Sequence, residues 1–532
     1  MDNQRVKDLF WASVISLAFV VGMCLLFHPR WETNDDVAMS MVAHGYGLVA
    51  TGSPNLIFSN VIWGYFVRHI PPVNGTLGYS IATMGILVIF GVAMVYALRR
   101  LGTGWLISII ALSLVLVRPI LFPQFTINSG LMTVGAILCW YLYGIREGNK
   151  TVLLVGCFLA FVGYLVRSQE FLLVLFTGLP LLQWNRLVKD RSAKIAALFL
   201  VIVLGVAEFV DYQAYQGKDW QAFNALNSAR LPYTDFGATS LLLSRPDVYE
   251  KYSYSENDVR LIGRWGVYAD PKLADSKKLN QMLLDIEFAH KRIVLANVAV
   301  AFKAMLHPSL LPIFLVALMF LLAKFNLRIS LVLGIFLLSI TAMALLGRPG
   351  IIRVYYPLVA MLFIFSIIIA RNELESRKKR WVFLYIVLFV GVLINYNNVI
   401  AESRAAIKSD VFVRSQLVSF PDKPVIVWGS DFPYDAVYPV LNIPMISLRY
   451  QLHGFGVFSP APFSVASREN RNGRGMASQL ASRDGMSIVA DDGQIQVVGR
   501  YCNERLRGEL KVVAEEKHGA VFVRTIRCEM HH

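Results

Sequence analysis

The sequence Trp31-Glu32-Thr33-Asn34-Asp35-Asp36-Val37-Ala38-Met39 directly follows the first long apolar run of the chain. It sets three carboxylates close together beside an expected membrane surface. Burying a carboxylate near hydrocarbon costs several kcal/mol, so acids at this depth indicate a functional site. The alternative is an ordinary helix start, with Asn34 or Asp35 as the N-cap and Asp36 favoured in the first turn by the helix dipole. Both interpretations place a helix start here, and only the first gives the acids a chemical role.

The composition is that of a membrane protein with many spans. Of the 532 residues, 56% are hydrophobic and 16% are charged, and the mean hydropathy is +0.52, which is too apolar for a soluble protein. The formal net charge of +15 does not indicate nucleic-acid binding, because Lys and Arg lie in short connectors and not in a basic stripe with aromatic residues. No small-residue cleavage site follows residues 9–27, so we expect the first span to remain as an anchor.

Apolar runs near the length that crosses a bilayer, about 20 residues, predict about eleven transmembrane helices. They cover residues 8–28, 80–98, 104–122, 129–145, 151–166, 170–184, 195–211, 305–323, 329–346, 352–370 and 381–398. Lys and Arg gather in the connectors on the side of the N-terminus, and the short connectors on the other side hold few. The positive-inside rule therefore places the N-terminus in the cytoplasm, and an odd number of spans places the tail outside.

This topology predicts a polytopic α-helical membrane protein with two parts. The first is a transmembrane domain over residues 1–400 with long outer loops at 29–79 and 212–304, and the second is a small C-terminal extracytoplasmic α/β domain at 401–532. In the tail, residues 425–428 and 519–523 have the β-branched and aromatic composition of strands. In the second outer loop, Ser255 and Asp258 have the spacing of a capping box.

Four arginines lie at the predicted outer ends of spans: Arg118, Arg167, Arg348 and Arg353. The planar guanidinium group suits two-point contact with phosphate. A single arginine at this depth can equally extend to lipid headgroups. Four at the same depth, in outer connectors otherwise poor in cations, favour an anionic ligand, and Arg353 is the main candidate because it lies just inside a span.

A second set of polar residues suits contacts with a sugar. Residues 220–230 carry aromatic and amide side chains at helical spacing, so rings could cover the faces of a sugar and amides could bind its hydroxyls. The alternative is a loop helix that packs on the membrane domain. The candidate acceptor-binding residues are Glu32, Asn34, His44, Trp220, Asn224, Asn227 and Arg230.

The motifs of common cofactor sites do not occur in the sequence. The nine histidines show no His-x-x-x-His pairing and the five cysteines no Cys-x-x-Cys pairing, so a zinc site has no support in the spacing. A Gly-rich phosphate loop, a dinucleotide fingerprint and a nucleophile elbow are also absent from the sequence. A divalent cation, Mg or Mn, held mainly by Glu32, Asp35 or Asp36 stays open at this point.

The order of these features resembles the GT-C class of integral membrane glycosyltransferases, which use lipid-phosphate-linked sugars as donors. In that class one span precedes an outer loop with an acidic motif, commonly Asp-Asp or Asp-Glu, which Asp35-Asp36 matches. A long outer loop with acceptor contacts, an arginine that meets the donor phosphate and a C-terminal outer domain are also common, as at 212–304, Arg353 and 401–532. The first outer loop also resembles bacterial polytopic membrane proteins of this general type.

The resemblance implies transfer of a hexose or pentose from a polyprenyl-phosphate-linked donor, with inversion, in polysaccharide biosynthesis. The acceptor would be a cell-envelope glycan or lipid at the outer face of the bacterial inner (plasma) membrane. Both Asp35 and Asp36 would be catalytic: one of them, with Asp35 favoured, would be the general base, and the other would act through positioning or metal contact. Arg353 with Arg348 would stabilise the leaving phosphate. One alternative is a lipid-linked glycan polymerase or ligase. Another is a transporter or assembly protein, although transport would favour charged residues at mid-span and internal symmetry.

The five cysteines fall into two groups. Cys24, Cys139 and Cys157 lie within apolar runs and are expected to be packing residues. Cys502 and Cys528 lie in the hydrophilic tail. Because a tail outside the inner membrane of a bacterium is in an oxidising compartment, we predict a disulfide between these two.

The topology can be tested with reporter fusions, since it rests on the charge asymmetry of the connectors. Fusions after residues 190 and 376 are expected to report the cytoplasm, and fusions after residues 270 and 420 the outer side. The measurement is the activity of a phosphatase and of a fluorescent reporter fused at each position. A cytoplasmic signal at residue 420 would contradict both the number of spans and the functional interpretation.

Overall fold

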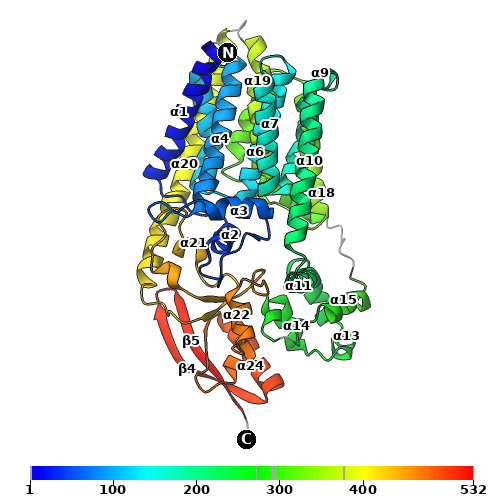
Figure 1. Ribbon diagram of the computed structural model, residues 1–532, viewed down its shortest axis with the longest axis vertical. Coiled ribbons are helices and arrows are strands. Elements are labelled where there is room, and N and C mark those ends of the chain that lie inside the picture. The colour runs from blue at the N-terminus through cyan, green and yellow to red at the C-terminus, as the bar shows by residue number, and fades with distance from the viewer. Residues whose placement is uncertain (1–2, 271, 289–294, 375–377, 531–532) are drawn as a thin grey trace.

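The fold was analysed in a computed structural model that describes residues 3–270, 272–288, 295–374 and 378–530. A bundle of long helices forms one end of the elongated molecule, and the outer loops and the tail form the other (Figure 1). The N-terminus lies at the far end of the bundle and the C-terminus at the tip of the tail. The two termini are therefore at opposite ends, as the predicted topology requires. Which end faces the cytoplasm stays a prediction.

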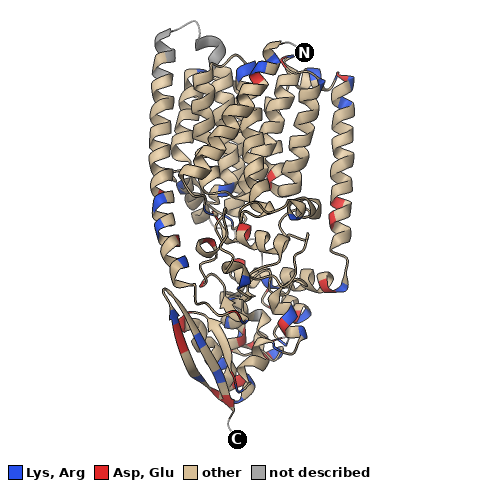
Figure 2. Cartoon of the chain, turned by 60° about the vertical axis from the view of Figure 1, so that its left-hand side comes forward, with Lys and Arg blue, Asp and Glu red and all other residues tan. Residues whose placement is uncertain are grey.

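Seven described helices are long and apolar enough to cross a membrane. They are α1 (Asn3–Leu26), α4 (Gly78–Arg100), α6 (Phe125–Gly144), α10 (Arg191–Ala214), α18 (Leu327–Leu345), α19 (Ile352–Leu374) and α20 (Lys378–Gln416). All seven coincide with predicted spans. Lys and Arg gather at the end of the bundle that carries the N-terminus, and few charged residues lie along the middle of the helices (Figure 2).

The other four predicted spans fall on shorter apolar helices. These are α5 (Trp105–Leu121), α7 (Lys150–Val166), α8 (Ser168–Gly178), which the 3-10 turn η1 (Leu179–Leu181) extends, and α17 (Leu311–Ala323). The short helix α9 (Trp184–Leu187) follows η1, and α16 (Leu295–Ala304) precedes α17. The total of eleven spans therefore stays a prediction. The fusion point at residue 376 lies outside the described residues.

Between α1 and α4, two short helices lie across the outer end of the bundle (Figure 1). These are α2 (Asn34–His44) and α3 (Val61–His69). Most of α2 is buried. The first outer loop is thus a folded layer between the bundle and the tail, and it carries the acidic sequence in its interior.

The second outer loop is a small helical unit. Its elements are α11 (Lys218–Asp235), α12 (Ala238–Leu243), α13 (Pro246–Lys251), α14 (Glu256–Gly263), η2 (Gly266–Tyr268) and α15 (Ser276–Asp285). Ser255 caps α14 in the predicted capping box with Asp258. Buried side chains of this unit, among them Tyr233 and Ile262, form one hydrophobic core with Trp428 of the tail. The loop and the tail therefore fold together.

The tail contains a five-stranded sheet in the order β2-β1-β3-β5-β4. Strands β1 (Val425–Trp428), β2 (Leu452–Phe455) and β3 (Met486–Val489) are parallel, and β4 (Gly508–His518) and β5 (Val521–Met530) form an antiparallel hairpin beside β3. The connections hold α21 (Tyr434–Val437), η3 (Ser447–Arg449), α22 (Val465–Arg471), α23 (Met476–Leu480) and α24 (Asp492–Leu506). All four residues of each parallel strand are buried, as expected for strands covered on both faces.

Helix α20 connects the bundle to this sheet. It runs without a break across residue 400, the predicted domain boundary, to Gln416, and β1 begins at Val425. On the same side, Arg30 after α1 forms ion pairs with Asp410 of α20 at 3.0 Å and with Asp435 of the tail at 2.6 Å. The tail is therefore fixed to the bundle at two points.

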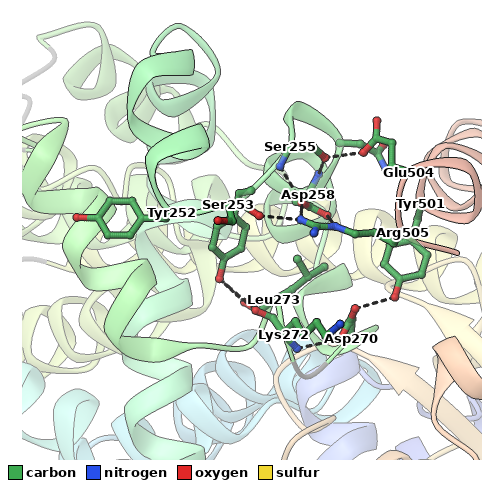
Figure 3. A network of polar contacts seen from close by, with 12 residues as sticks. Tyr252, Ser253, Ser255, Asp258, Asp270, Lys272, Leu273, Tyr501, Glu504 and Arg505 are labelled. Carbon is green, nitrogen blue, oxygen red and sulfur yellow. Dashed lines mark hydrogen bonds and ion pairs between the residues drawn. The ribbon is translucent and has the colours of Figure 1, made fainter. Parts of the chain in front are cut away.

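Polar side chains fix helix α24 to the second outer loop (Figure 3). Tyr501 donates a hydrogen bond to Asp270 at 2.7 Å, and Arg505 forms an ion pair with the buried Asp258. Cys502, the residue after Tyr501 in α24, forms the predicted disulfide with Cys528 of β5. The Cα–Cα distance is 5.7 Å. The disulfide therefore joins α24 to β5.

Removing the disulfide is expected to lower the stability of the tail. The bond spans 26 residues, and the chain-entropy argument gives about 3 kcal/mol for a loop of this length. The double variant Cys502→Ser/Cys528→Ser should therefore unfold at lower temperature than the wild type in native membranes, as limited proteolysis of the tail would show. Cys24→Ser, which changes a cysteine within α1, is the control. Equal protease resistance of all three proteins would contradict the prediction.

Candidate functional site

The acidic sequence forms the first turn of α2. Thr33 is the N-cap residue, with φ −142°, and Asp35 and Asp36 follow in the first turn, where the helix dipole favours negative charge. The helix ends at Gly45, whose φ of 74° is the left-handed conformation that glycine adopts most readily. The alternative that Asn34 or Asp35 caps this helix is therefore wrong, because Thr33 holds that position.

The carboxyl group of Asp36 is buried and connects three helices. It accepts hydrogen bonds from the Tyr79 hydroxyl of α4 at 3.1 Å and from the Phe125 backbone N–H of α6 at 3.0 Å. The Thr33 hydroxyl lies 3.0 Å from its other oxygen. No surface of this side chain is exposed, and both of its oxygens hold the structure, which favours a positioning role for Asp36 over direct contact with a substrate.

Burial is the main cause that raises the pKa of Asp36 to about 8, and the neighbouring Asp35 carboxylate is the next. Hydrogen bonds from Thr33, Phe125 and Tyr79 act in the opposite direction. Near neutral pH the Asp36 carboxyl group therefore holds its proton most of the time. A neutral carboxylic acid can both donate and accept hydrogen bonds, which suits a buried connecting position.

Asp35 has a different environment, one residue earlier. Its side chain is 37% exposed, and its Oδ2 lies 3.3 Å from a guanidinium nitrogen of Arg353 in the first turn of α19. The Arg353 side chain is 34% exposed. These two residues are 318 positions apart in the sequence, and the structure brings together the predicted base and the main predicted phosphate ligand. Both keep surface that a substrate can reach.

Further charged groups surround this pair. Arg167, between α7 and α8, interacts electrostatically with Arg353, Asp35 and Arg348, and its guanidinium lies 5.1 Å from the ring centre of Phe125. Glu170 is 3% exposed, and its Oε1 has no hydrogen-bond partner among the described residues. Arg348 is exposed and lies over Phe236 at 5.5 Å. Two of the four predicted phosphate ligands, Arg353 and Arg167, thus interact with Asp35, and Arg348 interacts with Arg167.

The fourth predicted phosphate ligand, Arg118, has to be revised. One guanidinium nitrogen lies 2.8 Å from both carboxylate oxygens of Glu32, and another lies 2.5 Å from Glu402. The Arg118 side chain is 4% exposed. Because two carboxylates neutralise Arg118 and its side chain is almost fully buried, its environment favours a structural role over contact with a phosphate. For the same reason Glu32 is a structural partner rather than an acceptor contact.

Most of the predicted acceptor residues contact protein instead. His44 accepts a hydrogen bond from the Tyr79 backbone N–H at 3.1 Å, and burial lowers its pKa to about 4, which keeps the ring neutral. Trp220 packs against Tyr215 and Phe463. These contacts agree with the packing alternative for residues 220–230.

Of the remaining acceptor candidates, two contact other protein groups and one is exposed. Asn227 accepts a hydrogen bond from Arg230, and the buried Arg230 lies 4.0 Å from the ring centre of Trp265. Asn224 is exposed. Only Asn34, of the seven residues, lines a cavity together with Asp35.

That cavity, about 250 Å³ in volume, opens beside the first turn of α2. Its walls come from α2, from the loop residue Trp265 and from the segments that follow β1 and β2 in the tail. Its lining residues include Asn34, Asp35, Trp265, Ser430, Gly456 and Ser459. Asp35 and part of the tail therefore line the same cavity.

The acids at this site do not converge on one point. Among the residues that the structure describes, no three His, Cys, Asp or Glu side chains are arranged to hold a metal ion. Glu32 contacts Arg118, Asp35 contacts Arg353, and Asp36 accepts three hydrogen bonds. The Mg or Mn ion that the sequence left open stays a prediction that these contacts do not support.

Sequence reasoning missed three residues of this region. Glu402 lies in an extended helix far along the chain, and only the fold brings it to Arg118. Glu170 is buried near Arg167, which its place in the sequence did not indicate. Trp265 lies in Gly263-Arg264-Trp265-Gly266, where an aromatic residue between glycines in a polar loop is the signal that could have indicated a special turn.

Comparisons with known proteins give one similar structure. No family model matches the sequence, and no curated protein matches it. Among solved structures, the chain is similar to the crystal structure of ArnT from Cupriavidus metallidurans bound to undecaprenyl phosphate, which covers 99% of this chain and 98% of that chain at 10% identity and a TM-score of 0.35. A likeness at this level adds no argument about function, which has to come from the geometry of the chain itself.

The raised pKa of Asp36 predicts a pH-dependent stability. The folded-state pKa of about 8 lies above the unfolded value of about 3.9, so the stabilising contribution of the bound proton is complete below about pH 4 and is lost as pH rises to about 8. Asp36→Asn removes this dependence and keeps the neutral hydrogen-bonding shape. The melting temperature of the variant relative to the wild type should rise between pH 5 and 8 and then level off.

Thermal unfolding in lipid nanodiscs over this pH range is the measurement for Asp36. Asp422→Asn, a change at an aspartate between α20 and β1, is the control, and its melting temperature should follow that of the wild type. A difference between Asp36→Asn and the wild type that does not change with pH would show that Asp36 is ionised when folded.

Proposed function

We propose that this chain is an integral membrane glycosyltransferase that transfers a sugar from a polyprenyl-phosphate-linked donor to a cell-envelope acceptor. The observation that carries the proposal is the contact between Asp35 and Arg353. A partly exposed carboxylate and a partly exposed guanidinium meet beside a cavity, at the end of the bundle where the folded loops and the tail lie. A base for a hydroxyl group and a ligand for a phosphate are thereby side by side.

The arginines supply the donor end of the site. Arg353 makes one contact with Asp35 at 3.3 Å, and a guanidinium group has five N–H donors, so it can bind a phosphate oxygen at the same time. Arg167 and Arg348 add positive charge to the same place. As the bond between the sugar and the phosphate breaks, negative charge grows on the phosphate, and fixed cations stabilise that charge.

Asp35 supplies the acceptor end. In the proposed step, the carboxylate of Asp35 takes the proton of an acceptor hydroxyl while the hydroxyl oxygen forms a bond to the anomeric carbon. The bond from that carbon to the phosphate oxygen breaks, and polyprenyl phosphate leaves with the electron pair. Attack opposite the leaving group inverts the anomeric centre. The proton then passes from Asp35 to water or to the released phosphate, which restores the base.

The two adjacent aspartates have separate tasks in this scheme. Asp36 is buried and holds α2 in place, whereas Asp35 is directed to the cavity and to Arg353. Neighbouring carboxyl groups in different environments are a common way in which one site provides different protonation states. The acceptor would be reached from the outer side, because the cavity lies between α2 and the tail.

Variants at Asp35 and Arg353 test the proposal together. Asp35→Asn keeps the size and helix position but cannot take a proton, so transfer should fall on the order of a hundredfold to ten-thousandfold while donor binding stays. Arg353→Lys keeps the charge and loses the planar fork, so binding of polyprenyl phosphate should weaken. The measurements are release of polyprenyl phosphate from labelled polyprenyl-phosphate hexoses and pentoses with an envelope extract as acceptor source, and direct binding of polyprenyl phosphate.

Matched variants away from the candidate site serve as controls. Glu208→Gln changes an acid of α10 that contacts Tyr164, and Arg328→Lys changes an arginine at the start of α18, which lies in a predicted inner connector. Both should behave as wild type in both measurements. Wild-type transfer by Asp35→Asn would remove the proposed base and with it the main support for the proposed activity.

A further inference from the structure

A cavity between the first outer helix, the second outer loop and the tail has a well-defined shape and no assigned ligand. Asn34 and Asp35 form one wall, Trp265 forms another, and Ser430 and Ser459 lie in the segments that follow β1 and β2. Ligands of open α/β sheets bind beyond the carboxyl ends of their parallel strands. The tail therefore presents the edge at which such sheets bind ligands to the predicted base.

Trp265 is held in an unfavourable backbone conformation at this cavity. Its φ is 67°, a left-handed value that is an outlier for a bulky side chain. The carbonyl of the preceding Arg264 accepts a hydrogen bond from the Trp428 indole at 2.5 Å, and the buried Arg230 guanidinium lies 4.0 Å from the Trp265 ring centre. Backbone strain of this kind persists where surrounding contacts impose it, often at ligand sites.

The opposite wall is made of small residues. Gly429, Gly454 and Gly456 line the cavity together with Ser430 and Ser459. A Cβ atom added at Gly456 would meet nothing within 4 Å, so open space faces this position. The Ser430 hydroxyl is exposed, whereas the Ser459 hydroxyl is hydrogen-bonded to Gly454 and Gly456. The Trp265 ring, the Ser430 hydroxyl and nearby backbone groups can offer an apolar face and hydrogen bonds to the same ligand. This combination suits a sugar ring, whose faces are C–H rich and whose rim carries hydroxyls.

Charge and size argue against other ligands. Among the residues that line the cavity, Asp35 is charged and none is Lys or Arg, so an anion would find no partner. The volume of about 250 Å³ is below the roughly 300–1,000 Å³ of pockets for drug-sized molecules, which limits the ligand to about one ring. A small cation could also bind between an indole and a carboxylate, and the experiment below separates this case.

The cavity also adjoins the donor end of the site. Phe458 in its wall packs edge to face on Phe58 at 5.6 Å. Phe58 and Phe125 are the two rings over which the Arg167 guanidinium lies. Asp35 itself lines the cavity and contacts Arg353. A ligand in the cavity would thus lie next to Asp35, which also contacts the candidate phosphate ligand Arg353.

We infer that this cavity binds a single neutral sugar ring of the acceptor, with Trp265 as the platform and the glycine- and serine-lined edge of the tail as the opposite wall. The inference rests on the proposed function where it assigns this sugar to the acceptor. It restricts the acceptor to a glycan or glycolipid with an accessible sugar. The binding itself does not depend on the donor. It makes the tail, through Ser430, Gly456 and Ser459, the part of the chain that selects the acceptor.

Binding of simple methyl glycosides tests this inference. The probes are methyl glycosides of hexoses, deoxyhexoses, N-acetylhexosamines and pentoses, with tetramethylammonium as the cationic probe. Saturation-transfer NMR is measured on the full chain in lipid nanodiscs, because glycoside detergents would compete. At least one glycoside should bind to the wild type. Binding only of tetramethylammonium, or of no glycoside, would overturn the inference.

Two variants remove the proposed site by different means. Trp265→Gly removes the ring and places glycine at a φ that glycine prefers, and Gly456→Leu fills the open space from the opposite wall. Each should weaken glycoside binding at least about tenfold. Gly205→Leu is the control, since a side chain there also meets nothing within 4 Å but lies on α10. Glycoside binding that survives in both site variants would overturn the inference.

Binding at the donor end distinguishes a failure of this inference from a failure of the proposed function. Arg353→Ala should lose binding of polyprenyl phosphate and keep binding of the glycoside, because Arg353 does not line the cavity. If the wild type binds the glycoside but never binds polyprenyl phosphate, the proposed function fails and the sugar site stands. If polyprenyl phosphate binds and no glycoside does, the sugar site fails and the donor assignment stands.

Discussion

The hydrogen bonds of one buried carboxyl group hold the site together. Asp36 joins α2 to the Tyr79 hydroxyl of α4 and to the start of α6 at Phe125. Without it, a buried hydroxyl and a buried N–H would lose their partner, and each such loss costs roughly 1–3 kcal/mol. The orientation of α2 follows from these contacts. Because Asp35 immediately precedes Asp36 in the same helix turn, its position beside Arg353 follows as well.

Ion pairs fix the tail over this helix. Arg118 connects Glu32 with Glu402 of α20, and Arg30 connects α20 with Asp435 of the tail. Replacing a buried pair as a whole is often neutral for stability, whereas removing one partner is not. We interpret these pairs as devices that set orientation, since they lie at the junctions between α1, α5, α20 and the sheet. A small rotation there would move the sheet edge away from Asp35.

Under the proposed function, this arrangement would bring a lipid-linked donor and a polar acceptor to the same carboxylate. The phosphate ligands belong to helix ends of the bundle, whereas the cavity walls come from the folded loops and the tail. Asp35 lies between the two. A lipid-linked donor could thus approach from the bilayer while a sugar ring enters from the aqueous side. Under the proposed function, binding of both ligands would exclude water from the site and so limit hydrolysis of the donor.

The sequence by itself determined the helices of the bundle, a helix start at the acidic sequence, the strand at 425–428, part of the strand that begins at 521, and the residue types at the site, because apolar periodicity, capping residues and charge are local properties. It could not separate Asp35 from Asp36, since neighbouring aspartates look alike until burial distinguishes them. It likewise could not show that Arg118 is neutralised by Glu32 and Glu402, or that Trp265 faces the first outer loop. These facts depend on contacts between residues far apart in the chain, and only the tertiary structure decided them.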